Sequence, residues 1–143
     1  MYCTLDDIKG SMTEDRLIEL TDEDDLGVID QTKIDKAIKS ADSLINSYCG
    51  TKYSVPFATA PDVVNTWSID IAIYYLYKNS DCDELPEKIK DAYKDAIKQL
   101  DGVSKGTISL GEDPAPSAAS EGGASSNKDS SDRVFTRDNM KGF

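Results

Sequence analysis

The hydrophobic residues of the chain are concentrated in one segment that is apolar on nearly every side. Residues 61–78 read PDVVNTWSIDIAIYYLYK and leave almost no polar face after the first helical turn. A helix that is apolar all round is normally buried on several sides. The segment contains Asn65, Ser68 and Asp70, and it is shorter than the roughly 20 apolar residues of a membrane span. We therefore expect it to be the central helix of a small all-α bundle.

A second segment, from Gln31 to Cys49, has apolar residues at spacings of three and four, the pattern of an amphipathic helix. Asp30 is expected to cap its start, and Gly50 is a natural C′ residue at its end. Its apolar stripe is expected to pack on the central helix. The residues expected to face solvent are Lys33, Lys36, Lys39, Asp42 and Asn46.

A third amphipathic segment begins at Pro86 and continues to about Leu100. Gly102 and Gly106 follow it and are expected to end the helix. We expect residues 103–110 to form a short extended or hairpin piece.

The first 20 residues predict two short helices. Thr4 followed by Asp7 has the form of an N-cap with an acid in the first turn. Gly10 and Ser11 interrupt this helix, and Thr13 is expected to cap the next one.

Residues 21–30, TDEDDLGVID, partly match a calcium-binding loop. With Gly27 at the sixth position of such a loop, acids stand at positions one, three and nine. Leu26 occupies position five, however, and Lys33 occupies position twelve, where a bidentate glutamate is required. We therefore expect a turn at Gly27 and no metal site.

The composition changes at Gly111. Residues 111–132 contain alanine as their only apolar residue, which is typical of a flexible low-complexity linker. The last eleven residues, RVFTRDNMKGF, are again aromatic, with three basic side chains and one acidic one. This pattern predicts three parts: a helical domain at 1–110, a linker at 111–132 and a C-terminal docking peptide at 133–143. The alternative is a tail without a role, which is common at chain ends.

Several aromatic residues are candidates for a subunit interface as well as for the core, because tyrosine is favoured at interfaces. Some lie in the short link between the second and the central helix, and others lie near the end of the central helix. The candidates are Tyr53, Pro56, Phe57, Tyr74 and Tyr77.

Charge and composition argue against several classes of function. The net charge of −11 argues against a protein that coats nucleic acid or binds an anionic membrane, although an acidic wall would let DNA slide past. The chain has no histidine, no phosphate-binding loop and three cysteines without CxxC spacing. Free thiols in a reducing cytosol are therefore expected. We expect no catalytic residues, no metal and no cofactor, and thus no enzyme.

Six stretches taken in order resemble the Mu-type head–tail connector family of tailed phages and prophages, also called head completion or adaptor proteins. They are MYCTLDDI, LTDEDDLGVID, INSYCGTKYSVPF, the IYYLY run of the central helix, KGTISLG and RVFTRDNMKGF. The resemblance covers essentially residues 1–110 and the last eleven. Leu26 departs from relatives in which residues 22–30 look more like a calcium loop.

The resemblance implies a structural protein of the virion, made in the host cytoplasm. Such subunits form a ring, commonly of twelve copies, below the portal protein. The ring extends the DNA channel without specific DNA binding and meets a tail terminator or completion protein. The resemblance also implies that the C-terminal peptide docks on the portal, the capsid or a neighbouring subunit. The docking residues would be Arg133, Val134, Phe135, Arg137 and Phe143.

A second interpretation remains open. The chain could be a soluble helical interaction module that binds a partner through its C-terminal peptide. It would then be a stable monomer or dimer without affinity for a portal.

Overall fold

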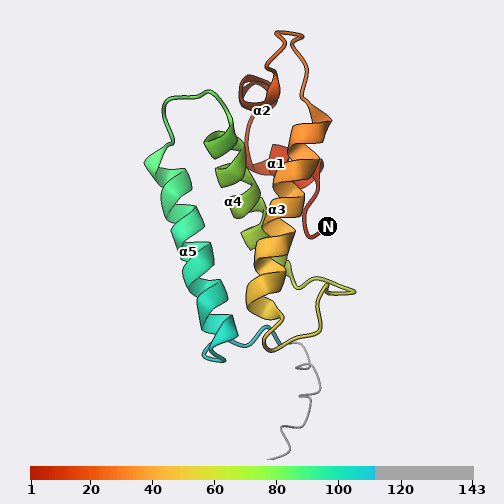
Figure 1. Cartoon of the computed structure of the whole chain (residues 1–143), viewed down its shortest axis with the longest axis vertical. Helices are drawn as coiled ribbons and strands as arrows, with labels where there is room; N and C mark the ends of the chain where they lie inside the picture. The colour runs from red at the N-terminus through yellow and green to blue at the C-terminus, as the bar shows by residue number, and fades with distance from the viewer. Residues whose placement is uncertain (112–143) are drawn as a thin grey trace, which may run out of the picture.

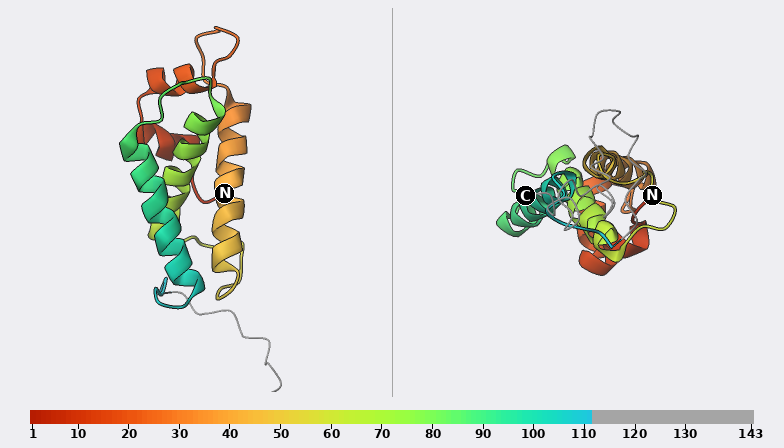
Figure 2. Two further views of the ribbon diagram at one scale, coloured as in Figure 1. Left: turned by 60° about the vertical axis from the view of Figure 1, so that its left-hand side comes forward. Right: turned by 90° about the horizontal axis from the view of Figure 1, so that it is seen from below.

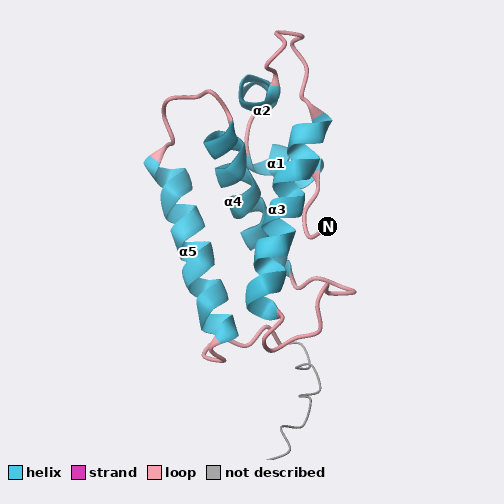
Figure 3. Cartoon of the chain, in the orientation of Figure 1, coloured by secondary structure: helices cyan, strands magenta, loops and turns pink. Residues whose placement is uncertain are grey.

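The computed structural model describes residues 1–111, which form five α-helices and no strand (Figure 1; Figure 3). The predicted all-α fold is confirmed for this part of the chain. The predicted docking peptide and all but the first residue of the predicted linker lie outside the described residues. The helices are α1 (Leu5–Ser11), α2 (Glu14–Thr21), α3 (Gln31–Cys49), α4 (Asp62–Asn79) and α5 (Glu87–Ser104).

The three long helices run alternately up and down, and α4 lies between α3 and α5 when the bundle is seen from below (Figure 2). α4 contacts each of the other four helices, as predicted for a helix that is apolar all round. Trp67 is only 3% exposed and donates from Nε1 to the Gln99 side-chain oxygen of α5 at 3.2 Å. The other buried residues of α4 are Val64, Ser68, Ile71, Ala72, Ile73, Leu76 and Tyr77.

Side-chain capping sets the starts of two of the five helices described, α1 and α3. The Thr4 and Asp7 side chains form a capping box at α1, and Asp30 accepts from the Thr32 N–H at 2.8 Å to cap α3. Thr13 stands at the N-cap of α2, but its side chain makes no capping hydrogen bond. Gly50 ends α3 with a φ of −61°, so the left-handed C′ residue predicted there is not present.

The end of α5 differs from the prediction. The helix continues through Gly102 to Ser104, because the additional turn buries Val103 completely. The N–H groups of Thr107 and Ile108 donate to the Gly102 carbonyl oxygen and so cap the end of the helix. The chain leaves the helix at Gly106, whose φ of +77° suits glycine. Residues 105–110 form turns instead of the predicted extended piece.

Two side chains predicted to face solvent, Asp42 and Asn46 of α3, instead hold the N-terminal segment. Asp42 Oδ1 accepts from the Tyr2 N–H and from the Ser68 hydroxyl, each at 3.1 Å. The Tyr2 hydroxyl donates to Asn46 and accepts from the Phe57 N–H at 3.1 Å. Part of the polar face of α3 therefore faces solvent, and Asp42 and Asn46 on the same face bind Tyr2.

Candidate interaction surfaces

Two of the five interface candidates are buried against their own chain. Tyr53 and Tyr77 are each 7% exposed. The Tyr53 hydroxyl accepts from the Leu110 N–H at 3.0 Å, and the Tyr77 hydroxyl accepts from Arg16 Nε at 3.1 Å. The Arg16 guanidinium also lies 5.3 Å from the centre of the Tyr77 ring. Both tyrosines bind segments of the same subunit and offer little surface to a second one.

The other three candidates keep accessible surface. Pro56 is exposed, and Phe57 is half-buried with its ring centre 5.8 Å from that of Tyr2. Tyr74 is half-buried and stacks on Tyr93 of α5, with the ring centres 3.9 Å apart. A subunit contact through these three side chains stays a prediction.

A groove between α3 and α5 has the composition of a protein-binding surface. Tyr48 of α3 and Tyr93 and Ile97 of α5 give it an apolar lining. Lys94, Lys98 and Asp101 add two positive charges and one negative charge, and Asp101 pairs with Lys105. Burial raises the pKa of the Tyr93 hydroxyl, and the neighbouring tyrosines of α4 raise it further. The groove has a volume of about 360 Å³. Its apolar members are only partly covered by their own chain.

The loop between α2 and α3, residues 22–30, projects from one end of the bundle (Figure 1; Figure 2). It is ordered by the Asp22 carboxylate, which accepts from the Leu26 N–H at 2.9 Å and from the Gly27 N–H at 2.6 Å. These hydrogen bonds lower the pKa of Asp22. Gly27 has a φ of +70°, so the predicted turn is present. Leu26 and Val28 are 71% and 57% exposed, so the loop carries two exposed apolar side chains close together.

The acids of this loop do not converge on a common point. Both Asp22 oxygens accept from backbone N–H groups, and Glu23 pairs with Lys33 at 2.5 Å. Within residues 1–111, no three side chains of His, Cys, Asp or Glu gather where they could share a metal ion.

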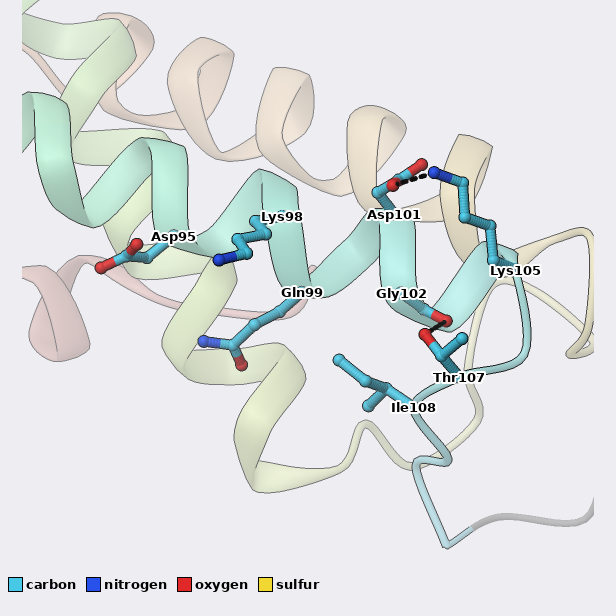
Figure 4. A pocket seen from close by; sticks show the side chains of 8 residues that line it. All are labelled: Asp95, Lys98, Gln99, Asp101, Gly102, Lys105, Thr107 and Ile108. Atoms are coloured by element: carbon cyan, nitrogen blue, oxygen red, sulfur yellow. Dashed lines mark hydrogen bonds and ion pairs between the residues drawn. The ribbon is translucent and has the colours of Figure 1, made fainter.

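A second hollow, at the C-terminal end of α5, is polar (Figure 4). Lys105 pairs with Asp101 at 2.6 Å, and the Thr107 hydroxyl donates to the Gly102 carbonyl oxygen at 3.0 Å. Gln99 in the same hollow is the partner of the Trp67 indole. These contacts close the end of the helix and do not bring a nucleophile against a base.

The three cysteines are free thiols. Cys3 and Cys49 are buried, and burial raises the pKa of both, that of Cys49 to about 11. A thiol that stays protonated near neutral pH is a poor nucleophile. Cys82 is half-buried in the loop between α4 and α5.

Comparison with known proteins assigns this all-helical chain to a family. A family model described as "Bacteriophage Mu, Gp36" matches residues 2–128, most of the chain. The chain belongs to the bacteriophage Mu Gp36 family. The affiliation with Mu-type phages inferred from the six sequence stretches is thereby confirmed.

Two relatives show how far the similarity to Gp36 proteins extends. The "Mu-like prophage FluMu protein gp36" of Haemophilus influenzae (strain ATCC 51907 / DSM 11121 / KW20 / Rd) is 35% identical over 116 residues, which cover 80% of this chain and 78% of the relative. "Gene product J" of Escherichia phage Mu is 26% identical over 143 residues, 99% of this chain and 98% of the relative. Among the described residues of this Gp36 protein, no helix is both long and apolar enough to cross a membrane.

Proposed function

We propose that this chain is a structural subunit of the virion neck, a head–tail connector that forms a ring below the portal and joins head to tail. The proposal is carried by the match to a Mu phage family over residues 2–128. It is supported by a small helical body that presents an apolar groove and a projecting apolar loop tip. A subunit of a larger assembly needs such uncovered apolar surface, whereas a monomer normally covers it.

The charge of the chain suits a wall of the DNA channel. With a net charge of −11, the subunit repels phosphate groups and does not hold passing DNA. The DNA then passes through the ring without specific binding. The lower rim of the ring meets a tail terminator or completion protein.

The C-terminal peptide supplies the attachment to the portal, the capsid or a neighbouring subunit. Phe135 and Phe143 act as apolar anchors, while Arg133 and Arg137 form charge-assisted hydrogen bonds. Val134 adds apolar contact between them. A chain of the length of residues 111–132 spans at most roughly 70 Å, at about 3.3 Å per residue, and this length allows the peptide to reach a partner well beyond the helical body.

The mass of the purified chain, measured alone and after mixing with the portal protein of the same genome, tests the proposal. We expect the chain to join a ring-sized complex when the portal is present, and deletion of residues 133–143 to abolish that complex. The matched control replaces residues 112–132 with a Gly/Ser linker of equal length and keeps the peptide. A chain that stays monomeric or dimeric whether or not the portal is present would favour the soluble interaction module instead.

A further inference from the structure

We propose that the loop at residues 22–30 of one copy docks into the groove between α3 and α5 of a second copy. The inference rests on the proposed function, because it supplies the lateral contact of the connector ring. The two surfaces match in chemistry, and both stay at least partly accessible within residues 1–111. The loop has an apolar tip among acids, and the groove has an apolar floor beside two lysines and one acid, Asp101, which pairs with Lys105.

The loop is suited to act as the inserted part. Leu26 and Val28 expose most of their apolar surface at its tip. The loop is held in shape by the Asp22 hydrogen bonds and by the Glu23–Lys33 ion pair. A segment that is already ordered loses little conformational entropy on binding. Its apolar side chains are therefore available for contact without a prior folding step.

The groove is suited to receive that tip. Tyr48, Tyr93 and Ile97 offer half-buried apolar surface, and tyrosine contributes large contact area at low entropic cost. Lys94 and Lys98 line the same groove and are exposed. Glu23, Asp24 and Asp25 precede the tip of the loop, so opposite charges meet when Leu26 enters the groove.

The charges of the groove also favour the loop over the other candidate occupant, the C-terminal peptide. That peptide carries three basic side chains and one acidic one, so it would meet Lys94 and Lys98 with like charge. The loop carries acids in the four consecutive positions from Asp22 to Asp25. The acidic loop of a second copy is thus the better electrostatic match.

The loop and the groove lie too far apart within one subunit to contact each other, so the contact must join two copies. The loop ends at Asp30, where α3 begins, and Tyr48 lies near the other end of that helix. At 1.5 Å per residue, about 27 Å of helix separates them. The loop of a copy therefore cannot reach its own groove. A contact between two different surfaces is heterologous, and repeated around an axis it closes a ring.

Disulfide trapping between two singly substituted chains tests the contact. Both chains carry Cys82→Ser, one adds Leu26→Cys, and the other, enlarged by a tag, adds Ile97→Cys. In the assembled oligomer under mild oxidation, we expect a mixed dimer, with neither chain forming a dimer alone. The matched control pairs Val63→Cys with Ile97→Cys, because Val63 is also an exposed apolar residue but lies on α4.

Charge exchange provides a second measurement that does not depend on cysteine chemistry. Asp24→Lys or Lys98→Glu alone should each weaken association between copies, and the two together should restore part of the loss. Leu26→Asp should weaken it by about tenfold or more, because an apolar anchor is replaced by a charge. Val63→Asp should leave it unchanged, and thermal melting shows that each variant is folded.

The outcomes separate this inference from the proposed function. If rings form with the portal but the Leu26–Ile97 pair cross-links no faster than the control pair, the loop contact is wrong and the connector function stands. If the chain stays monomeric both alone and with the portal, the contact and the connector function are both wrong.

Discussion

Asp70 is the acidic residue that α4 brings into partly buried surroundings. It lies between Trp67, which is buried, and Tyr74, which is half-buried against α5. Burial raises the pKa of its carboxyl above the ordinary value of 3.8. Removing a charge from water costs free energy unless the charge is paired. At neutral pH the ionised Asp70 therefore lowers the stability of the fold.

Asp70→Asn should raise the free energy of unfolding at neutral pH, because the amide keeps the shape and removes the charge. Between pH 3.8 and its raised pKa, the folded state binds more protons at Asp70 than the unfolded state does. The stability of the parent chain therefore falls as the pH rises through this window, and the variant lacks this fall. Urea unfolding from pH 3.5 to 8 measures the difference.

A variant of an exposed acid serves as the control for this experiment. Asp95→Asn changes an exposed residue of α5 and should shift stability by less than about 0.5 kcal/mol at every pH. Equal pH dependence of the Asp70→Asn variant and the parent chain would show that Asp70 is not desolvated.

Residue roles that depend on local sequence were predictable, and roles that depend on distant partners were not. Thr4 and Asp30 cap helices through N–H groups two or three residues away, so a short motif contains both partners. Asp42 looked like a solvent-facing position because helical periodicity describes only its own helix. Its partner, the Tyr2 N–H, lies 40 residues away. Nothing within α3 indicates that contact.

At the scale of elements, α4 determines the arrangement of the bundle. Its lack of a polar face was readable from composition, and in the structure α4 contacts all four other helices described. The end of α5 was harder to predict, since Gly102 is usually a helix-ending signal. The burial of Val103 outweighs that signal by extending the helix one turn. Local helix propensity does not account for tertiary packing of this kind.

Trp67→Ala should lower the free energy of unfolding by about 3–5 kcal/mol, because it leaves a large cavity at the centre of the bundle. It also removes the partner of Gln99. The control Val63→Ala, at a residue 37% exposed on the first turn of the same helix, should change stability by less than about 0.5 kcal/mol. Chemical denaturation of both variants measures the two values. A small effect of Trp67→Ala would mean that α4 is not the core helix.

At the scale of the whole molecule, the interaction surfaces were less predictable than the fold. Tyr53 and Tyr77 were candidates for a subunit contact, yet tertiary contacts with Leu110 and Arg16 bury them. The amphipathic pattern of residues 86–100 predicted a helix, but it could not show that α3 leaves a groove beside Tyr93 and Ile97. The exposed tip of the loop at residues 22–30 could not be predicted either, because an incomplete calcium-binding pattern does not show which side chain points outward.

A chain ending at Gly111 should fold as the full-length chain does. All helices described lie before that residue, and the buried core residues are drawn from residues 2–103. We expect the melting temperature to stay within about 3 °C of that of the full chain, since every core residue described is kept. Circular dichroism at 222 nm during heating measures it. A larger drop would show that residues beyond 111 pack on the bundle.

The loop at residues 22–30 and the C-terminal end of α5 lie at opposite ends of the bundle (Figure 1). Changes at sites separated by much more than 10 Å and without shared partners usually have additive free energies. If the C-terminal peptide docks on the portal, it shares no partner with the loop, and the effects of Leu26→Asp and of deleting residues 133–143 on assembly should then add. Related phage proteins could then change the attachment peptide to suit a new partner without changing the contact between copies.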